Sequence, residues 1–268
     1  MSALILKVVA SLTMLLDHIG YCFWNRFPAD EEFRIIGRIA FPIFAYMIAS
    51  GYRRSRRPAV YLARLAAFAV ITEPFYNYCF FGHWIHTGGI NVLFTLGTGL
   101  LALMAGDLLR ERYTKDRFGL LPLASALLFA LAAEKLGTDY GMYGVMLIFL
   151  FDLAERAFGS AEEVRGDPKR TAARAAVIAA VCAAFGARFI LISLPPALFA
   201  RIAGDAAPKL PGSWEMTQMW SALSAIFIIP YSGRRGVTIN NRFLRAVYQY
   251  SFYAFYPVHL LVLGLICR

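Results

Sequence analysis

Asp17 and His18 lie side by side in SLTMLLDHIG, at residues 11–20, a segment that is otherwise largely apolar. Adjacent side chains on a helix diverge by about 100°, so these two are not expected to form a dyad with each other. We expect Asp17 to hold Arg38 or a tyrosine, and His18 to pair with Glu73 or another acid across the bundle. Because imidazole accepts and returns a proton near neutral pH, His18 is the candidate general base.

Other ionisable groups recur at a similar depth in later apolar segments. With a helix rise of about 1.5 Å per residue, four side chains lie about 20–22 Å from the inner ends of their helices: His18, Glu73, Arg188 and His259. Arg38 and Asn91 lie near the outer ends of theirs. Ionisable groups inside a bilayer cost about 2.5–3.5 kcal/mol each and usually face the bundle interior. We therefore expect one polar cavity in the outer half of the membrane, with Asn91 and Arg188 as substrate-binding candidates.

Prolines lie beside three of these groups, at Pro42, Pro74 and Pro257. A proline deprives the carbonyl four residues before it of its hydrogen-bond donor and kinks the helix. Pro42 in this way frees the carbonyl of Arg38. Such breaks are tolerated where they line a cavity, so the prolines favour the same polar layer, with simple packing kinks as the alternative.

Four arginines cluster in RRSRR, at residues 53–57. Arginines at a helix end commonly anchor it to anionic headgroups, but they also bind phosphate well. A phosphorylated cofactor from the cytosol could therefore enter beside Arg53, Arg54 and Arg57. No phosphate-binding loop or dinucleotide glycine pattern occurs in the chain.

No metal is expected, because His83 and His86 in HWIH are the only closely spaced histidines. The four cysteines show no metal-ligand spacing and lie in or beside apolar runs: Cys22, Cys79, Cys182 and Cys267. We interpret them as structural thiols. A disulfide between Cys22 and Cys79, near the outer face, is the alternative.

The elements that must position these residues are membrane-spanning helices. Hydrophobic residues make up 59% of the 268 and charged residues 16%, whereas soluble domains carry about 25% charged residues. Apolar runs of roughly 18–22 residues can cross a hydrocarbon core about 30 Å thick. We predict an all-α, polytopic integral membrane bundle forming a single transmembrane domain over 1–268. Its nine expected helices lie near 3–24, 35–52, 59–81, 91–109, 118–136, 140–156, 174–194, 215–232 and 246–266.

The net charge of +10 is explained by topology rather than by nucleic-acid binding. The loops around 53–57, 110–117, 155–174 and 233–245, with Lys7 and Arg64, hold 19 of the 27 basic residues. Loops on the other side, such as GHWIHTGG, are poor in them. Because Lys and Arg accumulate in cytoplasmic loops, we expect a cytoplasmic N-terminus, an odd number of spans and a C-terminus on the outer side of the membrane.

Several segments together resemble the TraX family. They are LKVVASLTMLLDHIGY, RIIGRIAFPIFAYMIASGYRRSR, NVLFTLGTGLL, DYGMYGVMLIFLFDL and FYAFYPVHLLVLGL. The resemblance runs from about Lys7 to Leu265 and is weakest in the loops at 155–174 and 195–214.

This resemblance implies a role in bacterial conjugation, where the family's namesake is linked to N-terminal acetylation of pilin. It implies Asp17 and His18 as the reactive motif, with Arg38, Tyr140 and His259 as further candidates. The expected activity is acyl transfer from acetyl-CoA to the pilin amine within the membrane. The alternatives are head-to-tail cyclisation of pilin without CoA, a proton-coupled transporter, and a non-catalytic pilin assembly factor.

Overall fold

The computed structural model describes residues 1–23, 30–113, 119–203, 217–234, 236–238 and 240–267; residues 30 and 188–203 are described for the backbone only. Within these residues the structure is helical, and one isolated bridge joins Ile90 to Thr138. The helices are α1 Ala3–Cys22, α2 Asp30–Gly37, α3 Ala40–Arg54, α4 Pro58–Phe81, α5 Val92–Arg112, α6 Leu120–Lys135, α7 Gly141–Phe158, α8 Pro168–Ala203, the 3-10 helix η1 Gln218–Ser224, α10 Ala225–Ile228 and α11 Arg242–Cys267.

Local sequence signals set several helix ends. The Asn91 side chain caps α5 by accepting a hydrogen bond of 3.0 Å from the backbone nitrogen of Leu93. Helix α4 begins at Pro58, where a missing N–H costs nothing, and ends before Gly82, whose φ of 79° favours glycine. These ends place Glu73 and Asn91 opposite each other across a short connection.

The expected second span at 35–52 is broken. Helix α2 ends at Gly37, Arg38 and Ile39 form a turn, and α3 begins at Ala40. Pro42 lies in the first turn of α3 and cannot donate to the carbonyl of Arg38, which is the physical reason for the break. The break agrees with the kink expected at this proline. Pro74 and Pro257, in contrast, lie inside continuous helices.

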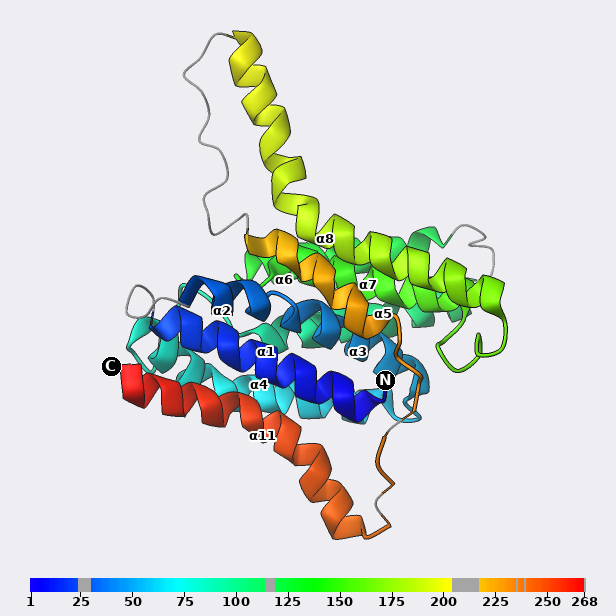
Figure 1. Cartoon of the computed structure of the whole chain (residues 1–268), viewed down its shortest axis with the longest axis horizontal. Coiled ribbons are helices and arrows are strands. Elements are labelled where there is room, and N and C mark those ends of the chain that lie inside the picture. The colour runs from blue at the N-terminus through cyan, green and yellow to red at the C-terminus, as the bar shows by residue number, and fades with distance from the viewer. Residues whose placement is uncertain (24–29, 114–118, 204–216, 235, 239, 268) are drawn as a thin grey trace.

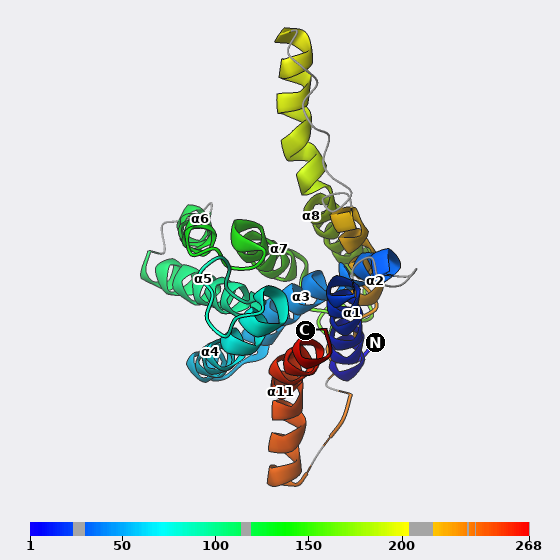
Figure 2. The same ribbon diagram turned by 90° about the vertical axis from the view of Figure 1, so that its left-hand side faces the viewer.

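Helix α3 is the centre of the bundle and packs against α1, α5 and α7 (Figures 1 and 2). Two thirds of its span, 67%, is buried, against 17% for α4, which is peripheral. Fully buried apolar side chains from four helices form the core: Leu6, Ile43, Leu100, Ile148 and Phe151. This packing fixes the rotation of α3, and thereby which of its side chains face each neighbour.

The membrane bundle is confirmed, but the count of nine spans is not. Among the described residues, six segments are long and apolar enough to cross a bilayer: Ala3–Cys22, Glu31–Arg54, Pro58–Phe81, Val92–Arg112, Pro168–Ala187 and Arg242–Cys267. Helix α6, with 16 residues, is shorter than the roughly 17–25 needed, and α7 carries three charged side chains near its end, Asp152, Glu155 and Arg156. The expected span at 215–232 lies partly outside the described residues, and its described helices together cover only Gln218–Ile228.

The two chain ends lie at opposite ends of the bundle (Figure 1). We call the end that holds Met1 the inner end and the end that holds Cys267 the outer end. The N-terminal part of α11 and the C-terminal part of α8 project from the bundle in opposite directions in both views (Figures 1 and 2).

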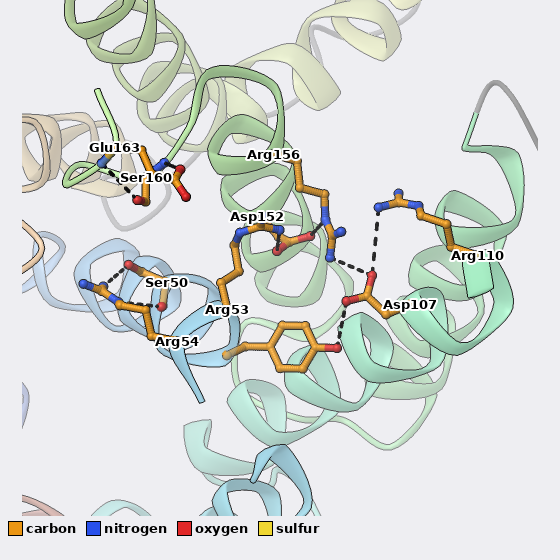
Figure 3. Close-up of polar contacts among 10 residues, drawn as sticks. Ser50, Arg53, Arg54, Asp107, Arg110, Asp152, Arg156, Ser160 and Glu163 are labelled. Carbon is orange, nitrogen blue, oxygen red and sulfur yellow. Dashed lines mark hydrogen bonds and ion pairs between the residues drawn. The ribbon is translucent and has the colours of Figure 1, made fainter. Parts of the chain in front are cut away.

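Basic side chains gather at the inner end, where an ionic cluster joins α3, α5 and α7 (Figure 3). Arg156 binds Asp152 at 2.5 Å and Asp107 at 2.6 Å, and Arg53 lies 3.5 Å from Asp152. Tyr52 donates a hydrogen bond of 2.9 Å to Asp107. We call these residues the inner cluster.

Candidate active site

The site begins with two histidines that α1 and α11 bring into contact. His18 Nδ1 lies 2.7 Å from His259 Nε2, and the two rings are nearly parallel, with 11° between their planes. Both residues are buried, at 8% and 6% exposure. The expected partner of His18, Glu73, is not its partner in the structure. An imidazole 241 residues away in the sequence occupies that position instead.

A backbone carbonyl fixes the proton positions in this pair when both rings are neutral. His259 Nδ1 lies 2.8 Å from the carbonyl oxygen of Phe255, which can only accept. His259 Nδ1 therefore carries its hydrogen, and Nε2 is the acceptor. His18 Nδ1 must then be the donor to His259, which leaves the lone pair of His18 on Nε2. A neutral imidazole held in this tautomer can act as a general base.

Asp17 faces away from His18 and is held by two arginines. Its carboxylate accepts a hydrogen bond of 2.9 Å from Arg34 Nη1 and pairs with Arg38 Nη2. Both arginine side chains are at most 5% exposed. The charges of Arg34 and Arg38 also act on the His18 ring. The structure thus shows the expected contact between Asp17 and Arg38 and adds Arg34, which the sequence reasoning missed.

The signal for Arg34 is its spacing, since residues 34 and 38 are four apart and would share a face if the helix continued through both. A glycine makes the close approach possible: a Cβ at Gly37 would lie 2.2 Å from the Cβ of Asp17. Helix α2 can therefore press its backbone against Asp17 only because residue 37 has no side chain.

Glu73 binds Asn91 instead of a histidine. Its Oε2 accepts hydrogen bonds from Asn91 Nδ2 at 2.6 Å and from the Asn91 backbone nitrogen at 3.1 Å. Asn91 also donates to the carbonyl of Ala69 at 2.8 Å and is fully buried. These bonds give Asn91 a structural position at the start of α5, while its role in substrate binding stays a prediction. The charge of Glu73 still reaches the hydroxyl of Tyr256.

The turn before α7 contributes Asp139 and Tyr140. Tyr140 has a φ of 64°, rare outside glycine, and its ring stacks on Phe41 with centroids 3.8 Å apart. Burial raises the pKa of the neighbouring Asp139 to about 6, and the charges of Arg38 and Arg34 oppose that shift. The turn therefore brings a protonatable carboxyl beside the arginine pair. The side chain of Arg188 lies outside the described residues.

These groups lie close to one another. Asp17 is bound by Arg34 and Arg38, Glu73 is bound by Asn91, and aromatic rings pack against the histidines. Phe80 meets the His18 ring edge-on at 5.2 Å, and Tyr256 lies 6.1 Å from His18 and 5.6 Å from His259. Polar contacts and aromatic rings thus surround the histidines in the described part of this layer, and the open polar cavity expected around His18 stays a prediction.

The large cavity lies instead on the inner side of this layer. It has a volume of about 1270 Å³ and runs among α1, α3, α4, α5 and α11. Its outer end is formed by apolar and aromatic side chains, including Met14, Val92, Leu93 and Tyr256. Met14 and Tyr256 precede the two histidines by one helical turn, about 5 Å along each helix. Tyr256 therefore separates the cavity from the imidazole pair while contacting both.

The inner mouth of the cavity is strongly basic. Six described cations and one acid line it: Lys7, Arg54, Arg56, Arg57, Arg64, Arg234 and Glu162. Arg54 and Arg57 thus lie where a phosphorylated cofactor was expected to enter. Arg53 does not line the cavity, because its side chain points to Asp152 in the inner cluster (Figure 3). The sequence reasoning missed Lys7, Arg64 and Arg234 as mouth residues, since each comes from a different helix or loop.

Within the described part of the chain, no three His, Cys, Asp or Glu side chains gather closely enough to hold a metal ion. His86 stacks on Phe81 at 3.9 Å.

The sequence of this chain is similar to that of known proteins. The family model described as TraX protein matches residues 2–267. The chain is 31% identical to the probable fimbrial assembly protein FimC, serogroup H1, of Dichelobacter nodosus, over 98% of this chain and 94% of that protein. It is 29% identical to protein TraX of Escherichia coli, over 60% of this chain and 59% of that protein. No solved structure matches.

The family match covers nearly the whole chain, including both histidines, the arginine pair and every helix that lines the cavity. The protein therefore belongs to the TraX family.

Proposed function

We propose that this protein is a membrane-embedded acyltransferase that acetylates the N-terminal amine of a pilin subunit, with acetyl-CoA as the donor. The acceptor is inferred from the relatives, one of which is named as a fimbrial assembly protein. A pilin partner and a bilayer location follow from the same membership and from the apolar helices.

One observation carries the proposal: a large cavity leads from a basic mouth to the immediate vicinity of a buried imidazole pair. A CoA thioester has phosphates at one end and the reactive carbonyl at the other. The mouth residues Arg54, Arg57 and Arg234 suit the phosphates. The narrower apolar region beside Met14 and Tyr256 suits the uncharged pantetheine arm and a short acyl group.

His18 serves as the base in this scheme. The pilin amine attacks the thioester carbonyl, a C–N bond forms, and the C–S bond breaks. His18 Nε2 accepts the proton that the amine loses and returns it to the leaving thiolate. His259 is a positioning residue, because its Nε2 accepts from His18 Nδ1 and so keeps the other nitrogen free. The ion pairs of Asp17 with Arg34 and Arg38 hold α1 against α2 and the turn after it. Their charges set the electrostatic potential near His18.

This scheme requires the inner end to face the cytosol, where CoA is found. The basic mouth lies beside the N-terminus, because the backbone nitrogen of Ala3 donates a hydrogen bond of 2.8 Å to the carbonyl of Arg234, and both residues line the cavity. That placement supports a cytoplasmic N-terminus and a periplasmic C-terminus in the inner membrane. Amine and thioester then approach the histidines from opposite sides.

The test is the intact mass of pilin from cells carrying the protein with His18→Asn. We expect acetylated pilin with the unaltered protein and unmodified pilin with the variant. His83→Gln, on an exposed loop, is the matched control and retains acetylation. The amount of variant in the membrane and its unfolding curve exclude loss through misfolding.

Two results would overturn the proposal. Full acetylation with a folded His18→Asn protein removes His18 from the reaction. Pilin that is one water lighter than its linear chain, with no acetyl group, points to cyclisation instead.

A further inference from the structure

Two cysteines from different helices meet at the outer end of the bundle. Cys22 is the last residue of α1, and Cys79 lies in the last turn of α4. Their Sγ atoms are 3.6 Å apart, although 57 positions separate them in the sequence, and the two sulfurs are not joined by a disulfide in this structure. Of the other two cysteines, Cys182 instead contacts Ser224 Oγ at 3.4 Å.

We propose that Cys22 and Cys79 form a reversible disulfide that joins α1 to α4 beside the histidine pair. The inference rests on the proposed orientation, which places this end in the oxidising periplasm, and not on acyl transfer itself. The sulfurs need to approach by about 1.5 Å to reach the bond length of about 2.05 Å.

The reaction is a thiol–disulfide exchange with a periplasmic oxidoreductase that carries a disulfide. Cys22 and Cys79 together lose two protons and two electrons as their S–S bond forms, and the disulfide of the oxidoreductase is reduced to two thiols. Cys22 is partly exposed and Cys79 is buried. The thiolate of Cys22 is therefore the one that attacks the incoming disulfide, and Cys79 resolves the mixed disulfide.

The disulfide would affect the residues that surround the histidine pair. Cys22 follows His18 by four residues and so lies one turn further out on the same face of α1. Cys79 precedes Phe80, whose ring contacts both His18 at 5.2 Å and Tyr21 at 4.7 Å. The disulfide therefore fixes the two helices that hold His18 and its aromatic neighbour.

The test counts thiols in the full-length protein. Membranes are prepared without reductant, denatured in the presence of a maleimide, and analysed by intact mass. We expect two maleimide labels before reduction and four after reduction with dithiothreitol, with a peptide that links residues 22 and 79 in the unreduced digest. Four labels without reduction would overturn the proposal.

Single variants identify the pair. Cys22→Ser and Cys79→Ser should each carry three labels without reductant, because the remaining partner is released. Cys182→Ser, the matched control, should carry one label, on Cys267. Loss of two thiols that persists in Cys22→Ser would show a different pairing and would also overturn the inference. Since no activity is measured, failure here leaves the acyltransferase proposal untouched.

Discussion

Replacing Asp17 by asparagine should destabilise the protein severely, because it removes a negative charge that pairs directly with two buried arginines. The substitution keeps the size of the side chain and changes its charge. Arg34 Nη1 lies 2.9 Å from the carboxylate, and Arg38 Nη2 binds its other oxygen. An amide oxygen can accept one of these hydrogen bonds but neutralises neither cation.

The magnitude follows from burial. The arginine side chains are 4% and 5% exposed, so water cannot take over the role of the carboxylate. Removing one partner of a buried ion pair typically costs about 3–5 kcal/mol. We expect the free energy of unfolding of Asp17→Asn to fall by about that amount. Glu31→Gln, an exposed acid on the same helix as Arg34, should change it by less than about 0.5 kcal/mol.

The assay is reversible unfolding in mixed micelles with increasing denaturing detergent, followed by helical circular dichroism. Adding Arg34→Met to Asp17→Asn should recover part of the loss, because one buried charge is removed with its partner. If Asp17→Asn unfolds at the same detergent fraction as the unaltered protein, the arginine clamp is not a stabilising element and the reasoning fails.

Three further predictions concern the reaction and its pH dependence. His259→Phe removes the acceptor that orients His18 and should lower the acetylation rate about 10²-fold with donor binding unchanged; equal rates would refute the tautomer assignment. Arg54→Gln combined with Arg57→Gln should raise the KM for acetyl-CoA with little change in kcat, whereas Arg53→Gln, in the inner cluster, should leave KM unchanged. Asp139 has a pKa raised to about 6 from 3.8, so its protonated form favours folding; stability present below about pH 4 is lost as pH rises through 6, by about 3 kcal/mol. Asp139→Asn should remove this part of the pH dependence of unfolding, and an unaltered profile would contradict it.

The depth of the histidine layer could be predicted because helix rise and span boundaries alone place His18 and His259 at one level. The partner of His18 could not, because it depends on how α1 and α11 rotate against each other. The carboxylate of Glu73 was the chemically obvious choice, yet it lies where the start of α5 presents Asn91.

The arginines at 53–57 show a similar limit of prediction from sequence. Arg53 and Arg54 are adjacent and so point about 100° apart on α3. Which of them faces the cavity depends on the packing of α3 against α7, and only the structure places Arg53 beside Asp152. The count of nine spans is not confirmed for another reason: hydropathy marks apolar runs, but α6 and η1 are shorter than a helix that crosses a bilayer.

The central claim is that the cavity between the basic mouth and Tyr256 holds the acyl donor. The most direct measurement is an electron cryomicroscopy map of the protein with a non-transferable thioether analogue of acetyl-CoA. We predict density that runs from Arg54 and Arg57 to the ring of Tyr256, with the acyl end directed at His18. A map in which the analogue is bound elsewhere, or in which this cavity stays empty at saturating analogue, would contradict the account.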